Sequence, residues 1–191
     1  MKISILIALT AVLTAIPLYG SQNLLKNADF ENGMKGWTSA KWGNMPSEAE
    51  FYIDTNQPHS GGGCAAIKWI SGGNNLVLAQ TLPLQGKKNL VLTFWAKSDV
   101  MVGLSDRVQT TLRTFGKDGK PNAEPQSKIY TTSDIYQEFS WSMETPDDTE
   151  RVSIVLRCVT GVTAYFDDVT LIESQGIALK STTLWTPDKT I

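Results

Sequence analysis

Histidine and cysteine are scarce in this chain, and their scarcity limits the chemistry available to it. The 191 residues include one histidine, His59, and two cysteines, Cys64 and Cys158. A Ser-His-Asp site would have to use His59, yet this residue lies in the turn-like segment "NQPHSGGG", with no nucleophile elbow nearby. One histidine and two widely spaced cysteines also lack the paired spacing of zinc ligands. The sequence therefore argues against a serine hydrolase and a zinc enzyme.

The chain also lacks clusters of positive charge and phosphate-binding loops. It has 17 Lys+Arg against 19 Asp+Glu, and no basic cluster that would follow a phosphate backbone. The glycine-rich "SGGG" at 60–63 is not followed by a lysine, a hydroxyl residue and a helix, so we interpret it as a turn. Nucleic acid is not an expected partner.

One apolar run stands at the N-terminus. After Lys2, "ISILIALTAVLTAIPLYG" ends in small or turn-forming residues. Its strongly apolar part is shorter than the ~20 residues of a spanning helix, and its layout is that of a secretory signal peptide. We expect a signal peptide over 1–20, a folded domain over 21–173 and a tail over 174–191. The protein would then be secreted, periplasmic or at the cell surface, without membrane insertion.

An oxidising destination leaves two interpretations for the cysteines. Cys64 and Cys158 either form one disulfide or remain two buried, small, hydrophobic side chains.

Short alternating segments, rather than helical periods, dominate the remaining sequence. The segment "NLVLTFWAKSD" at 89–99 is predicted to be a strand, as is "DRVQTTLRTFG" at 106–116. In the second, alternation places Val108, Thr110, Leu112 and Thr114 on one face and Gln109, Thr111, Arg113 and Phe115 on the other. Further strands are expected over 136–144, 151–159 and 162–173. Turn-forming residues separate these segments, which predicts an all-β sandwich or barrel.

Four segments in order resemble one family. They are "NLLKNADFENGMKGW" at 23–37, "QPHSGGGCAAIKW" at 57–69, "LAQTLPLQGKKNLVLTFWAKSD" at 78–99 and "AYFDDVTLIE" at 164–173. Together they resemble carbohydrate-binding modules of the family 4/9 type, which is related to family 22. The resemblance implies a jelly-roll β-sandwich of two antiparallel sheets, galactose-binding-like, that binds polysaccharide without cutting it. Such modules usually accompany glycoside hydrolases; 191 residues leave no room for a catalytic domain, so we expect a free-standing module.

Acidic residues near both ends of the predicted domain allow three interpretations. In the family that the chain resembles, a structural Ca²⁺ is held between the first and last strands. The resemblance implies Asp29, Glu31 and Asp167 as ligands, with a carbonyl near Ser60, since calcium takes six to eight oxygens. The alternatives are solvated or capping acids, or a catalytic pair such as Asp29/Glu31 or Asp167/Asp168, which glycoside hydrolysis would require about 5 to 9.5 Å apart.

Aromatic and hydrogen-bonding side chains supply the candidate sugar site. Rings stack on the apolar face of a sugar, while amides and guanidinium groups bind its hydroxyls. We expect Trp37 and Phe94 in the core, and Trp95 in either sheet packing or binding. The alternative for the arginines is solvation or pairing with acids. The predicted sugar-binding residues are Trp42, Trp69, Gln109, Arg113, Tyr136 and Arg157.

The sequence therefore predicts a non-catalytic module that binds plant-type or other β-linked polysaccharide and assists glycoside hydrolases. A structural or adhesion β-sandwich without sugar binding is the first alternative. A small protein acting on glycosyl bonds is the second, and it would need paired acids inside a binding groove.

Overall fold

The computed structural model describes residues 22–73, 75–99, 108–158 and 161–174. Within these ranges it contains ten strands and no helix, and hence no helix long and apolar enough to cross a membrane. The predicted signal peptide and nearly all of the predicted tail lie outside the described residues.

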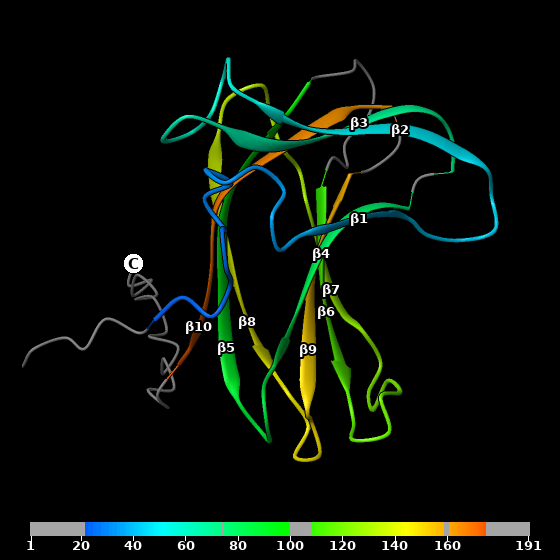
Figure 1. Ribbon diagram of the computed structural model, residues 1–191, viewed down its shortest axis with the longest axis vertical. Coiled ribbons are helices and arrows are strands. Elements are labelled where there is room, and N and C mark those ends of the chain that lie inside the picture. Colours follow the sequence, from blue (N-terminus) through cyan, green and yellow to red (C-terminus); the bar gives the residue numbers. More distant parts are fainter. Residues whose placement is uncertain (1–21, 74, 100–107, 159–160, 175–191) are drawn as a thin grey trace, which may run out of the picture.

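The strands form two five-stranded antiparallel sheets that face each other (Figure 1). This arrangement confirms the predicted all-β sandwich. Sheet A has the order β1 (Thr38–Lys41), β4 (Leu76–Pro83), β9 (Arg151–Cys158), β6 (Val108–Phe115) and β7 (Gln126–Tyr130). Sheet B has the order β2 (Ser47–Asp54), β3 (Cys64–Gly72), β10 (Thr163–Glu173), β5 (Asn89–Ser98) and β8 (Gln137–Glu144).

The five strands predicted from alternation correspond to β5, β6, β8, β9 and β10. In β6 the burial of alternate residues matches the predicted division into two faces. Strand β7, "QSKIY", is short and polar, and β1, "TSAK", has no apolar alternation, so neither produced a signal. Strand β2, "SEAEFYID", does alternate between polar and apolar residues and was a detectable strand that the prediction missed.

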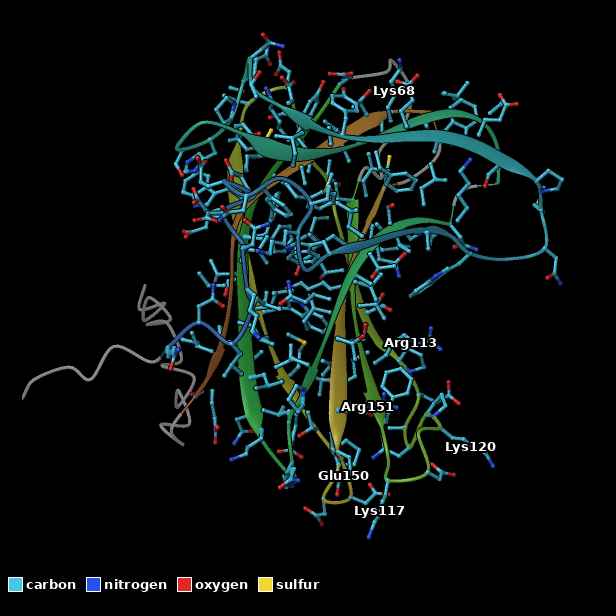
Figure 2. The ribbon with its side chains drawn as sticks, viewed as in Figure 1. Lys68, Arg113, Lys117, Lys120, Glu150 and Arg151 are labelled. Carbon is cyan, nitrogen blue, oxygen red and sulfur yellow. The ribbon has the colours of Figure 1, made fainter. Side chains whose placement is uncertain are left out.

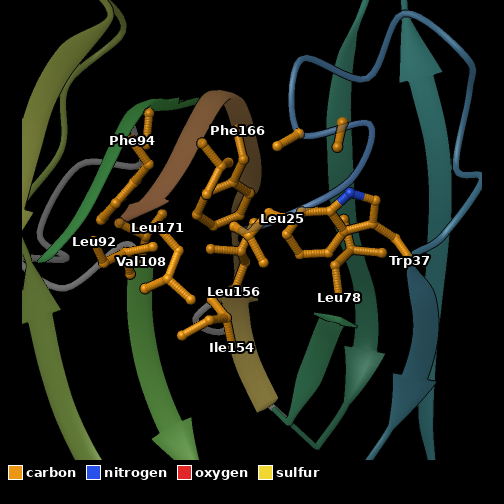
Figure 3. Packing of buried hydrophobic residues seen from close by; sticks show 14 of the residues in the cluster. Leu25, Trp37, Leu78, Leu92, Phe94, Val108, Ile154, Leu156, Phe166 and Leu171 are labelled. Atoms are coloured by element: carbon orange, nitrogen blue, oxygen red, sulfur yellow. The ribbon is translucent and has the colours of Figure 1, made fainter. Parts of the chain in front are cut away.

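The hydrophobic core fills the space between the sheets (Figure 3). Leu78 and Leu156 of sheet A and Phe94 and Phe166 of sheet B are fully buried there. Trp37 is 7% exposed and its indole N–H donates to the Asn27 carbonyl at 3.0 Å. Trp37 and Phe94 are therefore core residues, as predicted.

Both cysteines are buried thiols, so of the two interpretations the structure shows the hydrophobic one. The Cys158 thiol donates to the Val162 carbonyl at 3.2 Å. Burial raises the pKa of Cys158 to about 12 and also raises the pKa of Cys64, because a thiolate would be poorly solvated in the interior.

Candidate functional site

The outward side of sheet A carries the main candidate site, which we call face A. It consists of the side chains of β1, β4, β9, β6 and β7 that point away from the core, together with Trp42 just after β1. Alternation along β6 and β9 turns Gln109, Arg113 and Arg157 outward, while their neighbours Leu112 and Leu156 pack in the core. Three of the six predicted sugar-binding residues therefore share one sheet face.

Gln109 and Arg157 form one polar pair on face A. They are register partners on the adjacent strands β6 and β9, and the Arg157 guanidinium donates to the Gln109 amide oxygen at 2.6 Å. Partial burial lowers the pKa of Arg157 from its usual value, because the charged form loses solvation. The hydrogen bond fixes both side chains against the sheet.

A row of alternating rings and guanidinium groups forms the second element of face A. The Arg113 guanidinium carbon lies 5.2 Å from the centre of the Trp42 ring and 5.9 Å from that of Phe115. The Arg151 guanidinium lies 5.7 Å from the same Phe115 ring. These are cation–π distances, and such contacts orient flexible arginine side chains. Sequence reasoning missed Phe115 and Arg151, although alternation had already placed Phe115 beside Arg113.

Trp42 reaches across the sheet to make this row. Strands β4 and β9 lie between β1 and β6, so the contact between Trp42 and Arg113 crosses both of them. Beneath, Val77 of β4 and Val155 of β9 point outward and yet are 1% and 2% exposed. Trp42 itself remains 37% exposed. Face A thus combines covered valine side chains on its inner strands with an accessible indole ring.

The other two predicted sugar-binding residues lie elsewhere. Trp69 is on the inward side of β3, half-buried against the core, rather than exposed beside a loop as the sequence suggested. Its alternation with Lys68 explains the position, because Lys68 takes the outward side. Tyr136 precedes β8 at the opposite sheet, and burial raises the pKa of its hydroxyl. The structure therefore does not bring Trp69 or Tyr136 together with Trp42 and Arg113.

Tyr136 belongs to a packed group on the outward side of sheet B, which we call the His59 cluster: His59, Trp95, Tyr136 and Asp168. The His59 ring stacks on Trp95 with centres 3.8 Å apart and meets Tyr136 edge-on at 5.4 Å. Its Nδ1 lies 2.7 Å from an Asp168 oxygen. Of the two interpretations of Trp95, the structure shows packing, because His59 covers the ring.

The acids of the predicted calcium site meet one loop. The N-terminal segment runs beside β10: the Leu24 N–H donates to the Leu171 carbonyl at 2.8 Å, and the Val169 N–H donates to the Ala28 carbonyl at 2.9 Å. Glu31 then accepts from the Gly62 N–H at 2.8 Å. From β10, the carboxylate of Asp167 accepts from the N–H groups of His59 at 2.9 Å and Ser60 at 3.2 Å. Both ends of the domain thus hold the loop around Ser60.

In the structure, each of these acids accepts hydrogen bonds from the protein itself. Asp167 is fully buried, and burial raises its pKa despite the N–H donors around it. Asp29 is exposed and accepts from the Glu31 N–H at 3.4 Å. Asp168, at φ 47°, accepts from the Ser60 hydroxyl at 2.9 Å. Among the described residues, no three His, Cys, Asp or Glu side chains are grouped to hold a metal ion.

Face A thus combines aromatic rings and guanidinium donors on one open side of a β-sandwich. Residues 22–160 match the sequence pattern of the family described as "Carbohydrate binding domain". The chain belongs to this family, which confirms the resemblance drawn from its motifs. No curated protein matches the chain.

Solved structures share the fold at low sequence identity. "Family 16 Carbohydrate Binding Module-2" has a TM-score of 0.59 and 21% identity, over 79% of this chain and 100% of that one. TmCBM61 in complex with β-1,4-galactotriose has a TM-score of 0.55 and 17% identity, over 81% and 100%. The enzymatically active domain of tailspike protein 4 of bacteriophage CBA120 has a TM-score of 0.64 and 14% identity. There the match covers 80% of this chain but only 21% of the tailspike chain.

Proposed function

We propose that the chain is a secreted, non-catalytic module that binds a β-linked polysaccharide across face A and assists separate glycoside hydrolases. The observation that carries the proposal is the row of Trp42, Arg113, Phe115 and Arg151 on the outward side of sheet A. The galactotriose bound to the TmCBM61 neighbour is β-linked, and this supports the choice of linkage. The proposed secretion depends on the signal-like N-terminus.

The chemistry of face A suits a sugar chain. Trp42 offers a partly exposed ring for the C–H face of one sugar. Guanidinium N–H groups of Arg113 and Arg151 donate to oxygens on the sugar rim. A rigid ring loses little conformational entropy on binding, which favours a preformed platform. Hydrolysis would need paired carboxylates in the same groove. The five described strands of sheet A contain no Asp or Glu, which supports a binding role without catalysis.

Affinity electrophoresis against a panel of soluble polysaccharides tests the proposal. The wild-type chain should be retarded by at least one β-linked polymer and release no reducing sugar from it. Trp42→Ala should weaken binding roughly five- to hundredfold, by analogy with the ~1–3 kcal/mol lost when a ring stacked on a base is removed. Its melting temperature should change little, because Trp42 lies outside the core cluster.

Trp95→Ala is the matched control, since it removes an equal ring from sheet B and should leave retardation unchanged. Retardation by no polysaccharide would favour an adhesion or scaffold role. Release of reducing sugar, lost on mutating an acid, would overturn the non-catalytic proposal.

We also propose that Ca²⁺ stabilises the junction of the N-terminal segment, β10 and the loop around Ser60. Oxygen ligands are available from Asp29, Glu31 and Asp167, which suits calcium. Glu31 and Asp167 would have to exchange backbone N–H donors for the cation. Chelation, with the melting temperature as the readout, tests this directly.

A further inference from the structure

Charge is divided unequally between the two sheets. The described strands of sheet A contain no acidic residue and five basic ones: Lys41, Arg113, Lys128, Arg151 and Arg157. The strands of sheet B contain the basic residues Lys68 and Lys97 and the acids Glu48, Glu50, Asp54, Glu138, Glu144, Asp167, Asp168 and Glu173. A chain with a net charge of only −2 therefore presents one locally positive sheet.

Two of these basic residues lie beside the rings of face A, and the acid nearest to them in the chain is Glu150, which precedes β9. Arg113 on β6 and Arg151 on β9 both point outward, and Figure 2 shows both on the side away from β5 and β10, with Lys68 at the other end of the molecule. None of the ion pairs among the described residues includes Arg113 or Arg151. By contrast, Lys68 on sheet B is paired with Glu50 at 2.9 Å.

One hydrogen-bond donor on face A has no acceptor within the described part of the chain, and two other polar pairs bond to each other. The Arg113 Nε is buried and has no hydrogen-bond partner among the described residues. The amide oxygen of Gln109 already accepts from Arg157. The hydroxyls of Thr111 and Ser127 bond to each other at 2.9 Å. A buried donor without an acceptor costs free energy, so the Arg113 side chain is poorly satisfied by the protein alone. Because the Nε is buried, a ligand on face A would meet the terminal guanidinium N–H groups of Arg113 instead.

A neutral sugar hydroxyl both donates and accepts, so sites for neutral sugars pair donors with acceptors. A carboxylate only accepts, and it binds guanidinium groups through two parallel N–H···O bonds. Face A provides guanidinium groups without carboxylates, which complements a ligand that carries the carboxylates itself. The Trp42 and Phe115 rings contact the Arg113 guanidinium, and Phe115 also contacts that of Arg151, which orients both arginines.

We infer that the polysaccharide bound on face A is a polyuronate, whose carboxylates pair with Arg113 and Arg151 while Trp42 stacks on a sugar ring. This inference rests on the proposed function and narrows it from β-linked polysaccharide to an acidic one. A planar carboxylate matches the planar guanidinium fork, so we choose uronate over sulfate as the anionic group.

The decisive comparison uses one polymer in two forms. Calorimetric titration would measure binding of β-linked polymannuronate and of the same polymer after reduction of its carboxyl groups to neutral alcohols. The wild-type chain should bind the acidic form about tenfold or more tightly, since two charge-assisted contacts are lost in the reduced form. That preference should shrink between roughly 50 and 300 mM NaCl, because salt screens exposed charges. This arm needs no variant, so misfolding does not confound it.

Variants then locate the effect. Arg113→Gln and Arg151→Gln should each weaken binding of polymannuronate roughly fivefold or more, and binding of the reduced polymer less than about twofold. Arg113→Lys should be intermediate, because it retains the charge and loses the planar fork. Lys68→Gln is the matched control: it removes the same charge from sheet B and should change neither affinity. Melting curves would verify that each variant is folded.

The outcomes are distinguishable. Equal binding of the acidic and reduced polymers overturns the inference and leaves the proposed function standing. Equal binding of dextran sulfate, with the same dependence on Arg113 and Arg151, overturns the uronate assignment. Binding of no polysaccharide at all overturns the proposed function itself.

Discussion

The outward sides of both sheets carry aromatic and basic side chains, but these side chains are arranged differently on each sheet. On face A, Arg113 lies between Trp42 and Phe115, and the row remains accessible at Trp42. On sheet B, His59 stacks on Trp95 and contacts Asp168, so these side chains pack against one another. Rings and cations thus form a surface in one sheet and a packed cluster in the other.

The two sheets differ in whether the chain supplies hydrogen-bond acceptors for their basic side chains. On sheet B the cations have acceptors within the chain: Lys68 contacts Glu50, and Lys97 donates to Gln57 while lying 4.9 Å from the Tyr165 ring. On sheet A the strands contain no acid, so the outward arginines contact rings and one amide instead. A polar aromatic surface is therefore a binding candidate where its donors lack acceptors, and a packing element where they have them.

The largest expected effect is the loss of stability when the inward Trp69, rather than the outward Trp42, is replaced by alanine. Trp69→Ala should lower the free energy of unfolding by about 3 kcal/mol, the lower end of the range for Trp to Ala, because the ring is half-buried. Denaturant unfolding would measure the loss, with Trp42→Ala as the control that should lose far less. Binding by folded Trp69→Ala protein should equal that of the wild type. Loss of binding without loss of stability would instead assign Trp69 to the sugar site.

Chelation tests whether the junction at sheet B needs a metal. If Ca²⁺ binds only the folded state, a hundredfold excess over its dissociation constant stabilises by about 2.7 kcal/mol. EDTA should then lower the melting temperature, and Glu31→Gln should respond less to added Ca²⁺ than the wild type. An unchanged melting temperature, with no metal in the purified protein, would exclude calcium. The N–H bonds to Glu31 and Asp167 would then alone hold the loop.

Variants of His59 test whether the outward side of sheet B contributes to stability alone or also to polysaccharide binding. His59→Ala should lower the free energy of unfolding by about 1 kcal/mol, since one ring stack and one partly exposed hydrogen bond to Asp168 are lost. His59→Phe should recover much of this by restoring the stack on Trp95. Polysaccharide affinity should be unchanged in both variants. A loss of affinity would show that both sheets contribute to binding.

The smallest effect is expected from thiol reagents. Native protein at about pH 8 should react slowly at Cys64 and Cys158, because both are buried and burial raises both pKa values. Two thiols should react in denaturant without a reductant. Detection of no reactive thiol in denaturant would indicate that the purified protein has formed a disulfide.

Much of the fold could be predicted because alternation is a local signal. In β6, period two is sufficient to assign Leu112 to the core and Arg113 to the surface, and both assignments are correct. The same rule was not applied to Trp69, where the expectation followed a neighbouring loop instead of the strand's own alternation with Lys68. Phe115 was missed as a candidate site residue for a different reason. Its outward position was predicted, but its contacts with Arg113 and Arg151 were not.

By itself, the sequence determined the all-β class, the family and the two faces of β5 and β6. It singled out Glu31 and Asp167 as calcium ligands, and their hydrogen bonds to the loop around Ser60 came only from the structure. Only the tertiary structure decided that Trp42 meets Arg113, that Tyr136 lies on the opposite sheet, and that the acids and the arginines occupy different sheets. The physical reason is that period two specifies the side of a strand, while the pairing of strands far apart in sequence specifies which sides form one surface.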